Sequence, residues 1–216
     1  MSIYNRAQEK ITNLYAGDGW RSLFVKIRFW DAPFREIVAL VPKTGTVVDL
    51  GCGDGILANL ISLVNTKSKV IGIEKNSMRI GSAYKGLSNT KFINGDITSS
   101  RIPSADCILL IHVLHHLSSR EEQIKLISDC HDKLKKNGIF IIAEIQPEVS
   151  LKFLITWFTD HFLVACLFDH QIYSKIFFRK GKEWASLLKS QGFEVSLSDV
   201  SRGKPFSHIV LNCRKK

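Results

Sequence analysis

Apolar residues in this chain gather in short runs that alternate with amphipathic stretches. Runs typical of buried strands occupy residues 47–50, 69–74, 91–94, 106–110 and 139–143. Helical spacing follows the first run at 56–61, and a longer helix is predicted from about Arg120 to Lys136, ended by Asn137-Gly138. This alternation predicts an α/β fold with a mostly parallel sheet and helices on both faces.

Similar patterns flank the central part. Residues 2–16 have helical spacing, a break follows at 17–19, and Pro33 can open a further helix through Leu40. The segment between them, 20–30, combines aromatic and basic residues. Near the end, the pattern predicts a helix at 182–190 and strands at 193–199 and 206–213. Residues 151–168 are rich in aromatic and aliphatic side chains but too interrupted by polar ones to predict a membrane span.

Length and composition indicate one domain with a substantial core, because the chain has 216 residues and 45% of them are hydrophobic. The cysteines are scattered without a C-x-x-C pair, which favours a reducing compartment over a disulfide or zinc framework. The first residues, MSIYNR, are polar and lack the apolar core of a signal peptide. We therefore expect a cytoplasmic protein.

Charge widens the range of partners. The chain carries 30 Lys plus Arg against 20 Asp plus Glu, a formal charge of +10. This balance favours anionic partners, such as nucleic acid, anionic lipid head groups or carboxylated and phosphorylated metabolites. Improved solubility alone is the alternative explanation.

A glycine-rich turn follows the first apolar run, in the segment from Val47 to Gly55. A strand, a tight turn and a helix N-terminus form a nucleotide cradle in open α/β sheets. Gly51, Gly53 and Gly55 do not have the G-x-G-x-x-G spacing of dinucleotide sites, which disfavours a nicotinamide oxidoreductase. Asp49 just before the turn suits a ligand with a cationic centre better than a pyrophosphate. A simple tight turn is the structural alternative.

Two further acidic residues follow at strand ends. Glu74 ends the second strand and can accept hydrogen bonds from both hydroxyls of a ribose. Asp96, in a Gly-Asp turn after the third strand, can accept from an adenine amino group, with Ile97 packing beside the ring. The alternatives are a surface carboxylate at Glu74 and a turn cap at Asp96.

The order of these motifs resembles that of class I S-adenosylmethionine-dependent methyltransferases. The likeness rests on DLGCGDG at 49–55, Glu74, Gly95-Asp96 and the segment 106–117. A weaker likeness to small bacterial methyltransferases of lipid and polyene pathways rests on 26–29, 33–34 and 203–206. The family implies S-adenosyl-L-methionine as cofactor, held here by Asp49, Gly51, Cys52, Gly53, Gly55, Glu74, Lys75, Asp96, Ile97 and His112. It also implies a Rossmann-like sheet of seven strands whose last strand is antiparallel.

The resemblance divides the single domain into four parts. Residues 1–45 form a helical lid, 46–146 the cofactor-binding core, 147–182 a substrate-covering insertion, and 183–216 a C-terminal helix and strand pair. Within the insertion, Leu151 to Phe168 is expected to form a mobile, mainly helical aromatic cover over the acceptor.

Two residues are candidates for catalysis. His112 falls where the family places residues facing the methyl group and can act as a general base near neutral pH, although a satisfied loop histidine is an equal alternative. Glu144, at the end of the fifth strand, can take a proton from a hydroxyl or be a solvated acid. His112 and His116 have metal-ligand spacing, but no third ligand lies at a recognisable interval, so no metal is expected.

The aromatic and basic flanks suggest where an acceptor binds. Arg21, Arg28, Trp30 and Trp157 are candidate contacts for an acidic or apolar acceptor, or ordinary side chains lying along the surface. We therefore expect in-line methyl transfer to a small-molecule or lipid-like acceptor, and peripheral contact with an anionic membrane is a further expectation. The alternatives are an RNA methyltransferase, favoured by charge alone, and a non-catalytic binding subunit of the same fold.

Overall fold

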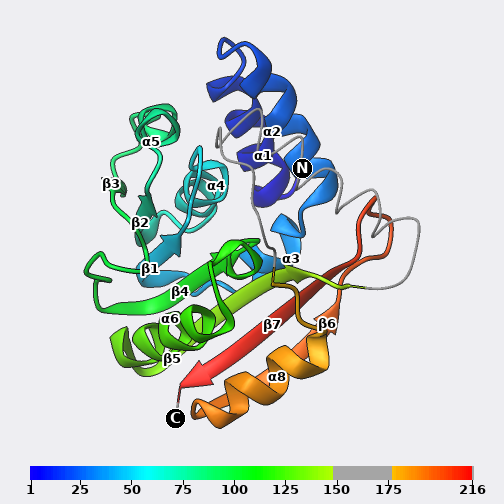
Figure 1. Ribbon diagram of the computed structural model, residues 1–216. Helices are drawn as coiled ribbons and strands as arrows, with labels where there is room; N and C mark the ends of the chain where they lie inside the picture. The colour runs from blue at the N-terminus through cyan, green and yellow to red at the C-terminus, as the bar shows by residue number, and fades with distance from the viewer. Residues whose placement is uncertain (148–176, 216) are drawn as a thin grey trace.

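The computed structural model describes residues 1–147 and 177–215, and a seven-stranded sheet runs through it in the order β3-β2-β1-β4-β5-β7-β6 (Figure 1). The first five strands are mutually parallel, and β7 runs antiparallel to both of its neighbours. This confirms the predicted Rossmann-like fold with an antiparallel last strand. The strands are β1 (Thr44–Leu50), β2 (Lys67–Glu74), β3 (Thr90–Asn94), β4 (Ala105–Ile111), β5 (Leu134–Ile145), β6 (Phe193–Asp199) and β7 (His208–Lys215).

Helices cover both faces of the sheet because the strands alternate their apolar side chains between two cores. Val47, Leu109 and Ile141 face one core with the N-terminal helices, whereas Val48, Ile108 and Ile142 face the other. The helices of the first layer are α1 (Ile3–Leu14), α2 (Trp20–Asp31), α3 (Phe34–Leu40), α4 (Ile56–Val64) and α5 (Ser77–Ala83). The second layer contains α6 (Arg120–Lys133) and α8 (Gly181–Ser190).

The boundary between α6 and β5 differs from the prediction. The helix ends at Lys133 and not near Lys136, because buried Leu134 already pairs with Ala105 of β4. The next pair joins Cys107 to Ile139, so residues 135–138 bulge from the strand. Asn137 lies in this bulge with φ +61° and so belongs to a strand irregularity, not to a helix end.

The carboxyl ends of β1, β2, β4 and β5 meet at one edge of the sheet, where ligands bind in open α/β folds. The C-terminal end of α2 reaches the same region, because Lys204 of the β6–β7 connection donates to the carbonyl of Ala32 at 3.1 Å. The predicted cover at 151–168 lies outside the described residues. In the part of the chain that is described, no helix is long and apolar enough to cross a membrane.

Candidate active site

The glycine turn at 51–55 is hydrogen-bonded to the neighbouring strand. The backbone N–H groups of Gly51 and Cys52 both donate to the carbonyl of Ile73 on β2, at 2.8 and 3.1 Å. Gly51, Gly53 and Gly55 all have positive φ, at 71°, 54° and 71°. A Cβ on Gly51 would lie 2.7 Å from the side chain of Val113, so the turn approaches the loop after β4 closely. This close approach requires glycine and leaves backbone facing the edge of the sheet.

Two buried carboxylates lie beneath this turn. Glu74 accepts from Gly53 N at 3.1 Å and from Asn76 N at 2.9 Å, which fixes it against the turn. Asp49 is buried at the end of β1. Burial, and secondarily the charge of Glu74, raise the pKa of Asp49 to about 7. A buried acid with this pKa gains its charge readily when a positively charged group binds beside it.

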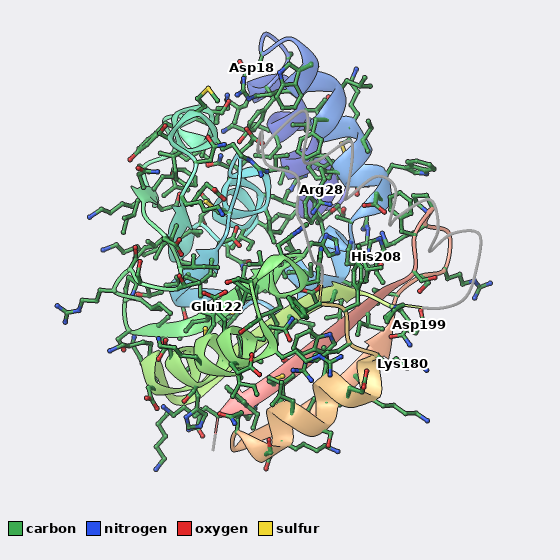
Figure 2. All side chains as sticks on the ribbon, viewed as in Figure 1. Asp18, Arg28, Glu122, Lys180, Asp199 and His208 are labelled. Atoms are coloured by element: carbon green, nitrogen blue, oxygen red, sulfur yellow. The ribbon has the colours of Figure 1, made fainter. Side chains whose placement is uncertain are left out.

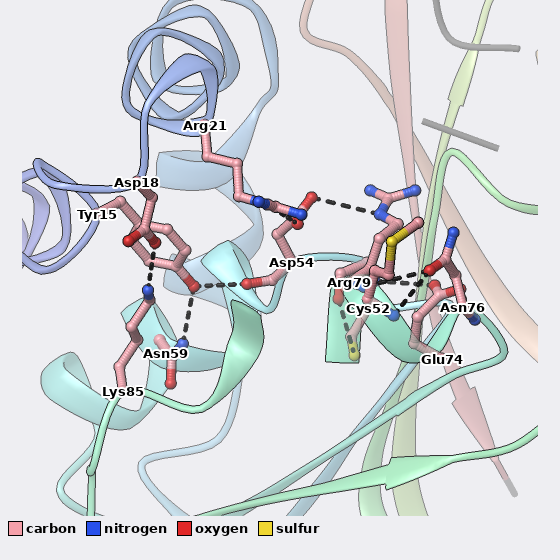
Figure 3. Close-up of polar contacts among 12 residues, drawn as sticks. Tyr15, Asp18, Arg21, Cys52, Asp54, Asn59, Glu74, Asn76, Arg79 and Lys85 are labelled. Atoms are coloured by element: carbon pink, nitrogen blue, oxygen red, sulfur yellow. Dashed lines mark hydrogen bonds and ion pairs between the residues drawn. The ribbon is translucent and has the colours of Figure 1, made fainter. Parts of the chain in front are cut away.

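An unpredicted clamp joins the turn to the N-terminal helices (Figure 3). Buried Asp54 pairs with Arg21 Nε at 3.1 Å and with Arg79 Nε at 3.3 Å. Its carbonyl accepts from the hydroxyl of Tyr15 at 2.5 Å, and that hydroxyl accepts from Asn59 Nδ2 at 3.1 Å. Arg21, a candidate acceptor contact, is therefore placed on the cofactor-side turn. No local sequence signal marks this clamp, since Tyr15 and Asp54 are 39 residues apart.

The turn after β3 is capped by its own acidic residue. Asp96 Oδ1 accepts from Thr98 N at 2.9 Å and from Thr98 Oγ1 at 2.7 Å, which lowers the pKa of this exposed carboxyl. Ile97 packs at the edge of the second core, and Lys75 is exposed directly after Glu74. The cap agrees with the alternative weighed for Asp96, and its adenine contact stays a prediction.

Glu144 holds the loop that follows β4. Its Oε1 accepts from the backbone N–H groups of Val113 and Leu114 at 3.2 and 2.9 Å, and its Oε2 contacts His115 Nδ1. Both oxygens are thus engaged by the loop, although Glu144 sits at the expected strand end. His115 is buried and stacks on Phe178 with ring centroids 5.1 Å apart.

His112 stands at the centre of a second polar cluster. Its φ is +56°, a conformation rare outside glycine, and its backbone N–H donates to Ala143 on β5 at 2.8 Å. The ring contacts Arg28 through Nδ1 and His208 through Nε2, both at 3.2 Å. His208 Nε2 contacts Asp31 Oδ1 at 2.8 Å. Asp31 and His208 were not among the residues singled out by the sequence.

The structure brings only some of the residues predicted to contact the acceptor close to the site. Arg28 joins His112, whereas Trp30 is 63% exposed on α2 and Trp157 lies outside the described residues. Within residues 1–147 and 177–215, no group of three or more His, Cys, Asp or Glu side chains is arranged to hold a metal ion.

Comparison with known proteins identifies the family of the chain. A family model described as a methyltransferase domain matches residues 20–198. The desmethylxanthohumol 6'-O-methyltransferase of Humulus lupulus is 33% identical over 195 residues, covering 88% of this chain and 49% of that protein. O-methyltransferase 12 of Dictyostelium discoideum is 28% identical over 168 residues, covering 76% and 43%. The chain thus spans about half the length of the curated relatives it matches.

Among solved structures, human N-acetylserotonin methyltransferase, determined in complex with SAM, has a similar fold. Its TM-score is 0.65 at 20% identity, and the match covers 94% of this chain and 58% of that one.

Proposed function

This chain belongs to the class I S-adenosylmethionine-dependent methyltransferases, and from that membership we propose that it methylates a hydroxyl oxygen of a small-molecule acceptor. The observation that carries the proposal is the convergence of the glycine turn, the buried acids and the His112 cluster at one edge of the sheet. S-adenosylmethionine, when bound, supplies a methyl group on a positively charged sulfur. The curated relatives that match are O-methyltransferases, which supports oxygen as the acceptor atom.

The residues present fit this cofactor. The turn at 51–55 is packed closely against the protein, because a Cβ on Gly51 would lie 2.7 Å from the side chain of Val113 and one on Gly55 2.7 Å from that of Ala83. Its backbone is therefore left to face the edge of the sheet, where a cofactor can approach it closely. Glu74 lies beneath the turn with a carboxylate able to accept from ribose hydroxyls. Asp49 offers a buried acid whose negative charge a cationic ligand would stabilise.

Residues at the carboxyl ends of β4 and β5 are placed to bind the methyl acceptor. Transfer requires that the acceptor oxygen be held in line with the methyl group and shielded from water. We assign proton acceptance to His112 and assign Glu144 to holding the 113–115 loop, since its carboxylate accepts from two backbone N–H groups of that loop, contacts His115 and is only 1% exposed. Arg28 beside His112 suits an acceptor with an acidic group.

Cofactor affinity should depend on pH through Asp49. Its pKa of about 7 means that ionisation is incomplete below neutrality, so affinity for the cationic cofactor should rise from pH 6 to pH 8, approaching tenfold per pH unit at the acid end. The same shift makes the free energy of unfolding of the free protein fall as pH rises from about 4 to about 7, because the unfolded Asp49 is already ionised.

Calorimetric titration of S-adenosylmethionine at several pH values, with wild type and Asp49→Asn side by side, measures this effect. The difference between the two proteins isolates Asp49 from other titrating groups. An identical pH slope in both would remove Asp49 from the cofactor site.

A lipid-like acceptor and contact with an anionic membrane form the finer part of the proposal. Trp20, Leu23, Ile27 and Trp30 are exposed on α2 at spacings of three and four residues, which places them along one helix face. With the net charge of +10, such a face suits an anionic membrane surface carrying an apolar acceptor.

Labelled S-adenosylmethionine tests the acceptor class directly. When the protein is incubated with labelled S-adenosylmethionine and an extract of the source cells, we expect the methyl label to appear in the small-molecule or organic fraction. If the acceptor is lipid-like, added anionic vesicles should increase the share of label found in lipid. Label recovered mainly in purified RNA would favour the RNA alternative. Tight cofactor binding without transfer to any fraction would favour a non-catalytic binding subunit.

A further inference from the structure

Four side chains from three distant parts of the chain form one continuous hydrogen-bonded line. Asp31 of α2 contacts His208 of β7, His208 contacts His112 after β4, and His112 contacts Arg28 of α2. The side chain of His208 is fully buried and that of Asp31 nearly so. Figure 2 labels Arg28 on α2 and His208 at the start of β7. The line therefore joins the N-terminal helices to the acceptor edge of the sheet.

The end groups determine every proton in this line. Arg28 can only donate, so His112 Nδ1 must present its lone pair. A neutral His112 then carries its proton on Nε2 and donates to His208 Nδ1. His208 in turn carries its proton on Nε2 and donates to the carboxylate of Asp31. Each imidazole thus has one tautomer, and the cluster of one cation, one anion and two neutral rings has no net charge.

Among residues 1–147 and 177–215, Arg28 is the hydrogen-bond partner of His112 Nδ1. The side chain of Arg28 is 22% exposed, whereas that of Asp31, one turn further along α2, is 7% exposed. Arg28 also lies 3.6 Å from Asp31 Oδ2, so in the described part of the chain both Asp31 and His112 hold its guanidinium. An anionic group on an acceptor would compete for the guanidinium, since carboxylates bind guanidinium through paired hydrogen bonds.

We infer that Asp31 and His208 are positioning residues that hold His112 in the tautomer required of a general base, and that Arg28 covers its Nδ1 until an acidic acceptor draws the guanidinium away. This inference rests on the proposed O-methyl transfer and names its acceptor class, a hydroxyl compound bearing a carboxylate or similar anion. Asp31 does not contact His112 directly but acts through the imidazole of His208. Its role is similar to that of a buried carboxylate that fixes a catalytic histidine.

The step balances without a further reactant. The acceptor hydroxyl gives its proton to His112 Nδ1 while its oxygen bonds the methyl carbon, and the carbon–sulfur bond breaks with its electron pair left on sulfur. The imidazolium that forms is stabilised by Asp31 through His208, and the proton leaves to solvent after the product. In the closed arrangement, burial and then Arg28, with smaller effects of His208, His115 and His116, hold the pKa of His112 well below its usual range.

Nitrogen-15 spectra of the histidine side chains test the line without any acceptor. Wild type should show both His112 and His208 as neutral Nε2–H tautomers, with His112→Gln and His208→Gln giving the assignments. Arg28→Gln keeps a donor but removes the positive charge, so the pKa of His112 should rise. Arg28→Lys returns a positive charge and should lower the pKa of His112 again. Arg35→Gln, an exposed arginine of α3, is the matched control. A proton on His112 Nδ1, or a pKa unmoved by Arg28→Gln, would overturn the inference.

Turnover tests the acceptor class with caffeic acid and its uncharged methyl ester. Wild type should prefer the acid and Arg28→Gln should lose that preference. Asp31→Asn should lower kcat by about 100-fold or more with little change in KM or cofactor affinity, Asp31→Glu should recover part of it, and Asp129→Asn is the surface control. Equal use of acid and ester by wild type would overturn the role of Arg28. Methyl transfer to neither compound would count against the proposed function. The nitrogen-15 spectra test the hydrogen-bonded line from Asp31 to His112 independently of that outcome.

Discussion

Replacing Glu74 with alanine should weaken the binding of S-adenosylmethionine by about a hundredfold or more. The carboxylate is expected to accept from two ribose hydroxyls, and hydrogen bonds to a charged group contribute about 1.5–3 kcal/mol each. Two such bonds amount to at least about 3 kcal/mol, which exceeds a hundredfold in affinity.

Glu74 has a second role that the experiment must separate from the first. Its oxygens also accept from Gly53 N and Asn76 N, so the alanine variant leaves two backbone donors of the turn without this partner. Thermal unfolding should therefore be measured beside calorimetry, and affinity determined where the variant is fully folded. Glu9→Ala, which removes an exposed carboxylate of α1, serves as the matched control. Unchanged affinity in a folded Glu74→Ala protein would reject the ribose role.

The framework of the site was predictable because its signals are local. The apolar runs placed β1 to β5 within a few residues, and the glycine turn and Glu74 follow their strands directly. Parallel strands bring their carboxyl ends to one edge, so short sequence intervals were enough to place Asp49 and Glu74 close together. The late end predicted for α6 shows the limit of such signals, since the pairing of Leu134 with Ala105 overrides a lysine-rich helical pattern.

The polar clusters could not be predicted because they depend on contacts between distant segments. Asp31 and His208 are 177 residues apart, and Arg28 and His112 are 84 apart. Neither α2 nor the start of β7 carries a motif that indicates the other. Arg21 and Arg28 lie on the same helix, yet one contacts Asp54 at the cofactor turn and the other His112 at the acceptor edge. The N-terminal helices therefore contact both halves of the site, a connection visible only in the fold.

Gly55 offers a stability test in which the chain supplies its own control. Gly55 and Gly86 have the same φ of +71°, but a Cβ on Gly55 would lie 2.7 Å from the Cβ of Ala83 and 2.9 Å from the ring of Phe92, whereas a Cβ on Gly86 would have no atom within 4 Å. Both alanine variants incur left-handed strain of about 1–2 kcal/mol, and only Gly55→Ala adds overpacking of about 1–3 kcal/mol.

Urea unfolding should therefore show a loss of about 2–5 kcal/mol for Gly55→Ala and about 1–2 kcal/mol for Gly86→Ala. Equal losses would mean that backbone strain alone explains the glycine, and that α5 and β3 yield to the added methyl group. A larger loss at Gly55 would mean that the turn is fixed by packing against Ala83 of α5 and Phe92 of β3. In that case Gly55 allows the turn between β1 and α4 to pack closely against α5 and β3. The turn then keeps its shape because Ala83 and Phe92 fill the space behind it.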